Sequence, residues 1–154
     1  MTAEHMRPKV GVGAIIVRDN KILLGKRSNS LKHGFGTWAP PGGHLEFFET
    51  FEQCAQREVL EETGLNVTNI RFATLTNDFF VKDNKHYITV FMVADCDHTQ
   101  QAQVLEPEQC DRWQWFASDE LPKELFVSFQ NLINQGFSIK ALEKRAESAI
   151  LEHR

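Results

Sequence analysis

The stretch from Gly43 to Leu65, GHLEFFETFEQCAQREVLEETGL, constrains the fold of this chain more than any other. Thr50 is followed three residues later by Gln53, which is the pattern of a capping box and predicts the start of a helix. Gly64 stands where a left-handed terminating residue belongs. The sequence therefore predicts a helix over Phe51 to Thr63.

Three carboxylates share one face of this predicted helix, because Glu58, Glu61 and Glu62 stand at i, i+3 and i+4. Like charges at this spacing destabilise a helix by roughly 0.2–0.5 kcal/mol per pair. At about 100° per residue they continue an apolar stripe, which predicts a face turned toward the protein. The stripe consists of Phe51, Cys54 and Ala55.

Clustered carboxylates on an inward face need a counter-charge, and Arg57 is the only basic residue inside the predicted helix. Oxygen ligands select hard cations, so the pattern predicts Mg²⁺, with Mn²⁺ as the alternative. The competing interpretation is a solvated acidic face that pairs with lysines.

The same stretch resembles the Nudix box, the signature of the Nudix hydrolases. The box runs Gly, five residues, Glu, seven residues, Arg-Glu, an aliphatic, any residue, Glu-Glu, any residue, Gly, an aliphatic. Its fixed positions are met by Gly43, Glu49, Arg57, Glu58, Val59, Glu61, Glu62, Gly64 and Leu65. One departure is Phe48, where a glycine is frequent. The resemblance implies the α/β fold class, as a Nudix-type α/β/α sandwich with a mixed β-sheet and a central catalytic helix.

The resemblance also implies roles for the residues of the box. Glu58 and Glu62 correspond to metal ligands, and Glu61 to a residue that activates water or shares a metal. Arg57 and Glu49 resemble the family's supporting ion pair, which orients the catalytic helix. The alternative for that pair is an ordinary surface salt bridge, which would stabilise little.

The segment before the box, Trp38-Ala39-Pro40-Pro41-Gly42-Gly43, resembles the Trp-x-x-Pro-Gly-Gly segment that leads into it in the family. The resemblance implies that the backbone carbonyl of Gly42 binds metal. A rigid turn without a ligand remains the alternative for the two prolines.

Composition limits the possible functions. The chain has 154 residues, 42% of them hydrophobic and 25% charged, which is typical of one soluble domain spanning 1–154. The net charge of −4 argues against binding to a nucleic-acid polymer. Three cysteines without a Cys-x-x-Cys pair predict reduced thiols and a cytoplasmic protein, with an intermolecular disulfide as the alternative. The sequence shows no secretory signal and no apolar run long enough to span a membrane, so we expect no membrane partner.

Outside the acidic helix, the hydrophobic pattern of the sequence predicts strands before and after that helix and helices at the end of the chain. The expected strands are 10–17, 21–27, an extended run within 67–80, 87–95 and 113–116, and the expected helix 122–135 is closed by Gly136. A C-terminal helical extension over about 138–154 is expected to dock through Ile139, Leu142, Ala146, Ala149 and Ile150, with a frayed tail as the alternative.

Several residues outside the box are candidates for the substrate site. Arg27, at a strand end, is the candidate for the phosphate tail, and either Glu106 or Glu108 for a further carboxylate. A nucleobase needs an aromatic or apolar slot. The candidates for it are Phe35, Trp38, His44, Phe79, Phe126 and Phe129. Each of these also has an ordinary interpretation, as a core aromatic or a solvated side chain.

Segments on both sides of the box, such as Leu-Leu-Gly-Lys-Arg and His-Tyr-Ile-Thr-Val, resemble the nucleoside-triphosphate diphosphatase branch related to the human thiopurine-hydrolysing enzyme. That resemblance implies a homodimer that hydrolyses a nucleoside triphosphate, including modified or non-canonical ones, to monophosphate and pyrophosphate by water attack. Ala39, Val127 and Ser128 differ from the branch in the expected base pocket. Two alternatives stay open: a hydrolase of a nucleotide sugar or dinucleotide, and a non-catalytic nucleotide-binding sensor.

Overall fold

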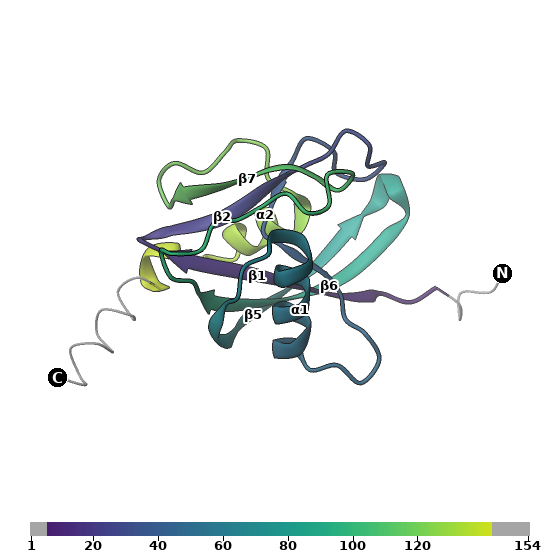
Figure 1. Cartoon of the computed structure of the whole chain (residues 1–154). Coiled ribbons are helices and arrows are strands. Elements are labelled where there is room, and N and C mark those ends of the chain that lie inside the picture. The colour runs from purple at the N-terminus through teal and green to yellow at the C-terminus, as the bar shows by residue number, and fades with distance from the viewer. Residues whose placement is uncertain (1–5, 143–154) are drawn as a thin grey trace.

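The structure, a computed structural model, describes residues 6–142 of the chain. Its elements (Figure 1) are β1 (Lys9–Arg18), β2 (Lys21–Arg27), β3 (Trp38–Ala39), β4 (Gly42–His44), α1 (Phe51–Thr63), β5 (Thr68–Phe80), the 3₁₀ turn η2 (Val81–Asp83), β6 (Lys85–Asp95), β7 (Cys110–Ala117) and α2 (Val127–Asn134). The expected strands 10–17 and 21–27 are present as β1 and β2 and form a hairpin. Asp19 and Asn20 take φ values of 51° and 62°, as a tight two-residue turn requires.

The seven strands form one mixed sheet in the order β3-β2-β1-β6-β5, with β4 added to β1 and β7 to β2. β1 and β6 run parallel, whereas β1 pairs with β2 in the antiparallel sense. The β1–β2 pairing lies beside their turn, at Val17↔Ile22 and Arg18↔Lys21. Farther from the turn, β1 pairs with β4 and β2 pairs with β3, while β7 pairs with β2 from Lys21 to Arg27. The sheet therefore divides between β1 and β2.

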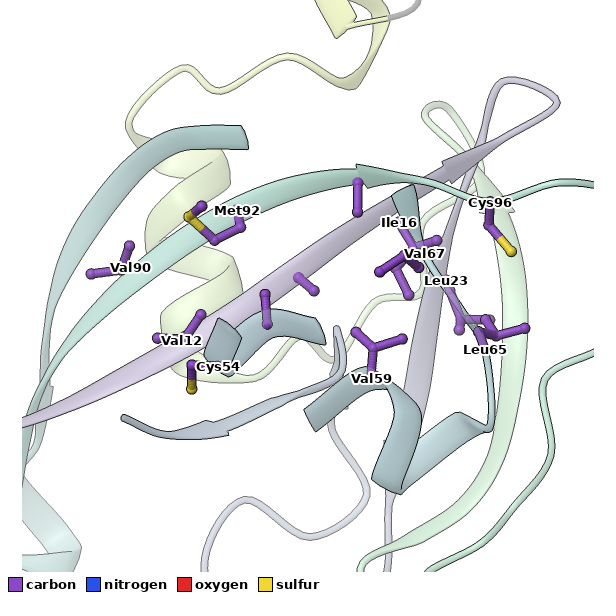
Figure 2. Packing of buried hydrophobic residues seen from close by; sticks show 13 residues of the cluster. Val12, Ile16, Leu23, Cys54, Val59, Leu65, Val67, Val90, Met92 and Cys96 are labelled. Carbon is purple, nitrogen blue, oxygen red and sulfur yellow. The ribbon is translucent and has the colours of Figure 1, made fainter. Parts of the chain in front are cut away.

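One helix covers each face of the sheet, which confirms the expected mixed α/β architecture (Figure 1). Successive side chains of a strand point to opposite faces. On β1, Val12 and Ile16 consequently join α1 in one core, while Ile15 joins α2 in the other. Figure 2 shows the α1-side core, in which Cys54 and Val59 of α1 pack near side chains of the sheet.

The limits and caps of α1 are confirmed. The Thr50 hydroxyl accepts a hydrogen bond from the Gln53 backbone N–H at 3.0 Å, and the Gln53 side chain accepts one from the Thr50 N–H at 2.9 Å. Gly64 ends the helix with a φ of 77°. The apolar stripe was predicted wrongly at one position: Phe51 is 39% exposed, so the inward face begins with Cys54 and Ala55.

The predicted start of the last complete helix is also wrong, because α2 begins at Val127 and not at Pro122. Trp38 donates its backbone N–H to the Glu124 carbonyl, and its own carbonyl accepts the Phe126 N–H. Leu125 forms a parallel bridge with Trp38. These tertiary contacts hold the segment before α2 in an extended conformation.

The expected C-terminal extension is described only at its beginning. Ile139 is buried, and Leu142 packs against the α2-side core. Ala146, Ala149 and Ile150 lie outside the described residues. Among the described residues, no helix is long and apolar enough to cross a membrane.

Candidate active site

A cavity of about 610 Å³ opens where β1 and β2 separate. This volume lies within the range of small-molecule sites. Its walls combine three kinds of side chain. The acidic ones are Glu46, Glu58, Glu61, Glu62 and Glu106, the basic ones are Arg27, Lys32 and Lys85, and the aromatic ones are His33, His44, Phe80, Tyr87, Phe91, Trp113 and Phe126. One cavity thus joins the acidic helix to an aromatic wall.

Two carboxylates of α1, Glu58 and Glu62, are buried, and their hydrogen bonds and neighbouring charges only partly offset the cost of lost hydration. Burial raises the pKa of Glu62 well above its ordinary value, and the neighbouring Glu58 raises it further. The Gly42 N–H, which donates to Glu62 Oε2 at 2.9 Å, acts in the opposite direction. Burial also raises the pKa of Glu58, against the effect of Arg57. A cation bound between these carboxylates would offset the cost of their lost hydration and would neutralise their mutual repulsion.

Arg57 ties α1 to the loop that precedes it. Its Nε and Nη2 donate to the two oxygens of Glu49 at 2.7 and 2.9 Å, which confirms the predicted ion pair. Its Nη1 donates to Glu58 at 2.7 Å, and Nη2 also donates to the His44 carbonyl at 3.2 Å. The hydrogen bonds from Arg57 lower the pKa of Glu49 to about 2. The guanidinium therefore orients Glu58 and anchors the helix.

The donor set fits a hard divalent cation by its chemistry. The carboxylates of Glu58, Glu61 and Glu62 line one cavity, and a side chain on Gly43 would overlap the Glu58 carboxyl. Within residues 6–142, no group of three or more His, Cys, Asp or Glu side chains is already gathered as a metal site. These three glutamates would hold the ion, with the Gly42 carbonyl as a further candidate.

Of the two candidates for an additional carboxylate, the structure favours Glu106. Glu106 lines the cavity, and its pKa is raised by burial and by the charges of Glu108 and Glu61. Glu108 is exposed and does not belong to the described cavity lining.

The aromatic candidates divide into three groups. Phe126 and His44 line the cavity, as predicted. Phe35 and Phe79 are each 61% exposed and do not belong to its described lining. Trp38 and Phe129 are buried in the α2-side core and do not line it either. The last four therefore lie outside the described wall of the cavity.

Arg27 lines the cavity, as expected for a residue near the substrate. Its Nε and Nη2 donate to the His33 carbonyl at 3.1 and 2.8 Å. Its guanidinium carbon lies 4.3 Å from the centroid of the Phe126 ring. Arg27 thus joins the loop after β2 to the aromatic wall.

Sequence reasoning missed part of the wall, namely Gly11 and Gly13 on β1 with Tyr87, Thr89 and Phe91 on β6. The two glycines face β6 in parallel register, Gly11 opposite Thr89 and Gly13 opposite Phe91. Glycines inside a strand often mark the close approach of a ligand or a neighbouring group. Their spacing in Gly-Val-Gly was the available signal.

A family model described as NUDIX domain matches residues 7–134, which include α1 and all residues that line the cavity. The chain belongs to the Nudix family. Among solved structures, the MutT NUDIX hydrolase from Burkholderia pseudomallei is similar, with a TM-score of 0.74 and 30% identity over 82% of this chain and 97% of that one. The mixed α/β fold is accordingly the Nudix fold.

Curated Nudix relatives match parts of the chain. The ADP-ribose pyrophosphatase of Methanocaldococcus jannaschii is 49% identical over 61 residues, which cover 40% of this chain and 35% of that protein. The NAD-capped RNA hydrolase NudC of Shigella dysenteriae is 31% identical over 121 residues, which cover 77% of this chain and 44% of that protein. The chain thus matches less than half the length of either relative.

Proposed function

We propose that this Nudix protein hydrolyses a nucleoside triphosphate, with a divalent cation, to the nucleoside monophosphate and pyrophosphate. The observation that carries the proposal is the single cavity in which the carboxylates of α1 and an aromatic wall meet. An aromatic wall suits a nucleobase, and buried carboxylates suit the cation that accompanies a polyphosphate. When bound, Mg²⁺ or Mn²⁺ supplies charge neutralisation and Lewis acidity at the phosphates.

The side chains of this cavity have separate roles in the proposed reaction. Glu58 and Glu62 are assigned to the cation because they are the two carboxylates of α1 whose pKa is raised by burial. The side chain of Glu61 is 53% exposed while it also lines the cavity, so it is assigned to accept the proton of the attacking water. The water oxygen bonds to one phosphorus atom of the α–β bridge. The bridging P–O bond breaks, and its electron pair leaves with the departing phosphate group.

A product assay tests this proposal. The protein is incubated with Mg²⁺ and a panel of triphosphates in ¹⁸O water, and pyrophosphate and orthophosphate are measured separately. We expect monophosphate and pyrophosphate in equal amounts, with the label in one product only, which identifies the attacked phosphorus. Release of orthophosphate and a nucleoside diphosphate would contradict the assigned cleavage site.

A second candidate is hydrolysis of a nucleotide sugar or dinucleotide. The similarity to a protein named ADP-ribose pyrophosphatase favours it. ADP-ribose and NAD therefore belong in the same panel. Turnover of either without turnover of any triphosphate would replace the first candidate by the second, and specific nucleotide binding without any turnover would favour a sensor.

Two further properties belong to the proposal. The three cysteines are free and buried, which supports reduced thiols and a cytoplasmic location. The resemblance to the triphosphate branch supports a homodimer, and sedimentation equilibrium would measure its mass directly.

A further inference from the structure

Asp78 on β5 is a fully buried carboxylate outside the machinery described above. Its Oδ2 accepts hydrogen bonds from the hydroxyls of Thr76 at 3.1 Å and Thr89 at 2.6 Å. Its Oδ1 accepts one from the side-chain amide of Asn131 at 2.9 Å. All three donors are neutral groups. Burying a carboxylate is costly unless it is hydrogen-bonded, so Asp78 holds these three donors in place.

The three donors come from three different elements. Thr76 and Thr89 stand opposite each other on β5 and β6, and Asn131 reaches the carboxylate from α2. The two threonines differ in one respect. Thr89 lines the cavity, whereas Thr76 is 1% exposed and does not belong to the described lining.

Gly11 stands opposite Thr89 on the neighbouring strand and places no side chain beside it. A Cβ on Gly11 would lie 3.9 Å from the Thr89 hydroxyl oxygen, in ordinary contact with it. Gly11 lines the same cavity. Thr89 lines the cavity as well, so we infer that its hydroxyl can contact a molecule bound there.

A threonine hydroxyl carries one proton and two lone pairs. Thr89 donates its proton to Asp78. Only lone pairs remain to face the cavity, so a group that bonds to this oxygen must be a donor. Cytosine, adenine and guanine carry amino groups that donate, whereas a carbonyl oxygen in the same place only accepts.

We propose that Asp78 is a positioning residue that fixes Thr89 as a hydrogen-bond acceptor, so that the cavity selects nucleobases with an exocyclic amine over their carbonyl counterparts. This inference rests on the proposed function in so far as it takes a nucleotide as the ligand of the cavity. Thr89 touches the base, and Asp78 acts through Thr89.

Matched substrate pairs test the selection: dCTP with dUTP, dATP with dITP, and dGTP with dXTP. In the wild type, at least one pair should show a kcat/KM for the amine member about tenfold higher or more. Thr89→Val, which keeps the shape and removes the hydroxyl, should bring that ratio close to one. Thr89→Ser restores the hydroxyl and should keep the preference.

Thr76→Val is the matched control. It removes a hydroxyl that bonds to the same oxygen of Asp78 but does not face the cavity. The ratio between the pair members should therefore stay close to that of the wild type. Loss of the preference in Thr76→Val but not in Thr89→Val would overturn the inference.

Asp78→Asn separates a positioning role from a structural one. Asn131 continues to donate to an oxygen, so the new amide oxygen faces Asn131 and the new NH₂ group faces the threonines. Thr89 then accepts from that NH₂ group and has its own proton free for the cavity. The preference should shift toward the carbonyl member of the pair. If Asp78 had only a structural role, the substitution would lower kcat/KM equally for both members.

Binding of the corresponding deoxynucleoside monophosphates, measured by titration calorimetry, separates this inference from the proposed function. Absence of triphosphate turnover by the wild type would contradict the proposed function, and the Kd ratios would still test Thr89. A wild-type ratio near one for every pair, or a ratio unchanged by Thr89→Val, overturns the inference.

Discussion

Phe48 is a single residue held in an unfavourable backbone conformation. Its φ is 66°, and its side chain is 91% exposed, so no burial offsets the cost. We expect Phe48→Gly to be more stable than Phe48→Ala by about 0.5–1 kcal/mol, because only glycine is free of the left-handed penalty. Both variants lose the same ring, so the comparison isolates the backbone. Urea denaturation measures the difference, and an alanine variant of equal stability would contradict it.

Glu62 is the most strongly desolvated carboxylate of the cavity. We expect Glu62→Gln to abolish turnover and yet to raise the melting temperature of the metal-free protein. The amide removes the charge that burial and Glu58 disfavour, and its oxygen still accepts the Gly42 N–H. Thermal unfolding in EDTA measures this, with Glu52→Gln, an exposed position of the same helix, as control. A marked fall in melting temperature would identify Glu62 as a structural residue.

Glu61 differs from its two neighbours by its exposure, since 53% of its side chain is accessible. We expect Glu61→Gln to reduce kcat by about 10²-fold or more, as removal of a general base does, with a smaller change in Mg²⁺ affinity. Metal titration against activity measures both quantities. A parallel loss of affinity and rate would make Glu61 chiefly a ligand and leave Glu106 as the candidate base.

The position of α1 as an element depends on Arg57 and Glu49. The pKa of Glu49 is lowered from 4.5 to about 2, so its ion pair contributes stability above about pH 4.5. That contribution is lost as the pH falls from 4.5 toward 2. We expect Glu49→Gln to be less stable at neutral pH and to show a flatter dependence of stability on pH in this window. Urea denaturation across the window tests this, and an unchanged slope would contradict it.

The closely packed molecule as a whole controls the reactivity of its thiols. Burial raises the pKa of Cys54 to about 12 and that of Cys110 to about 11, and it also raises the pKa of Cys96. The thiolate is the reactive form. We expect iodoacetamide at about pH 8 to leave all three unmodified in the native protein and to modify all three in guanidinium chloride. Intact mass measures the labelling, and rapid native modification of Cys54 would contradict the packing of the α1-side core.

What the sequence alone determined about this protein is local. The caps of α1 depend on residues three positions apart, and the shared face of Glu58 and Glu62 depends on one turn of a helix. Such spacings are set by the chain itself. The limits of the helix were therefore predictable before any tertiary contact was known, whereas the pair of Arg57 with Glu49 was expected from the resemblance to the Nudix box.

The tertiary structure decided which side chains reach the cavity. Neighbouring residues of a strand point to opposite faces, so Phe80 lines the cavity while Phe79 is exposed, and composition cannot distinguish the two. The group around Asp78 joins two strands and a helix, with Asn131 53 positions away along the chain. No local spacing in the sequence predicts these contacts, because they depend on strand register and on how α2 packs against the sheet.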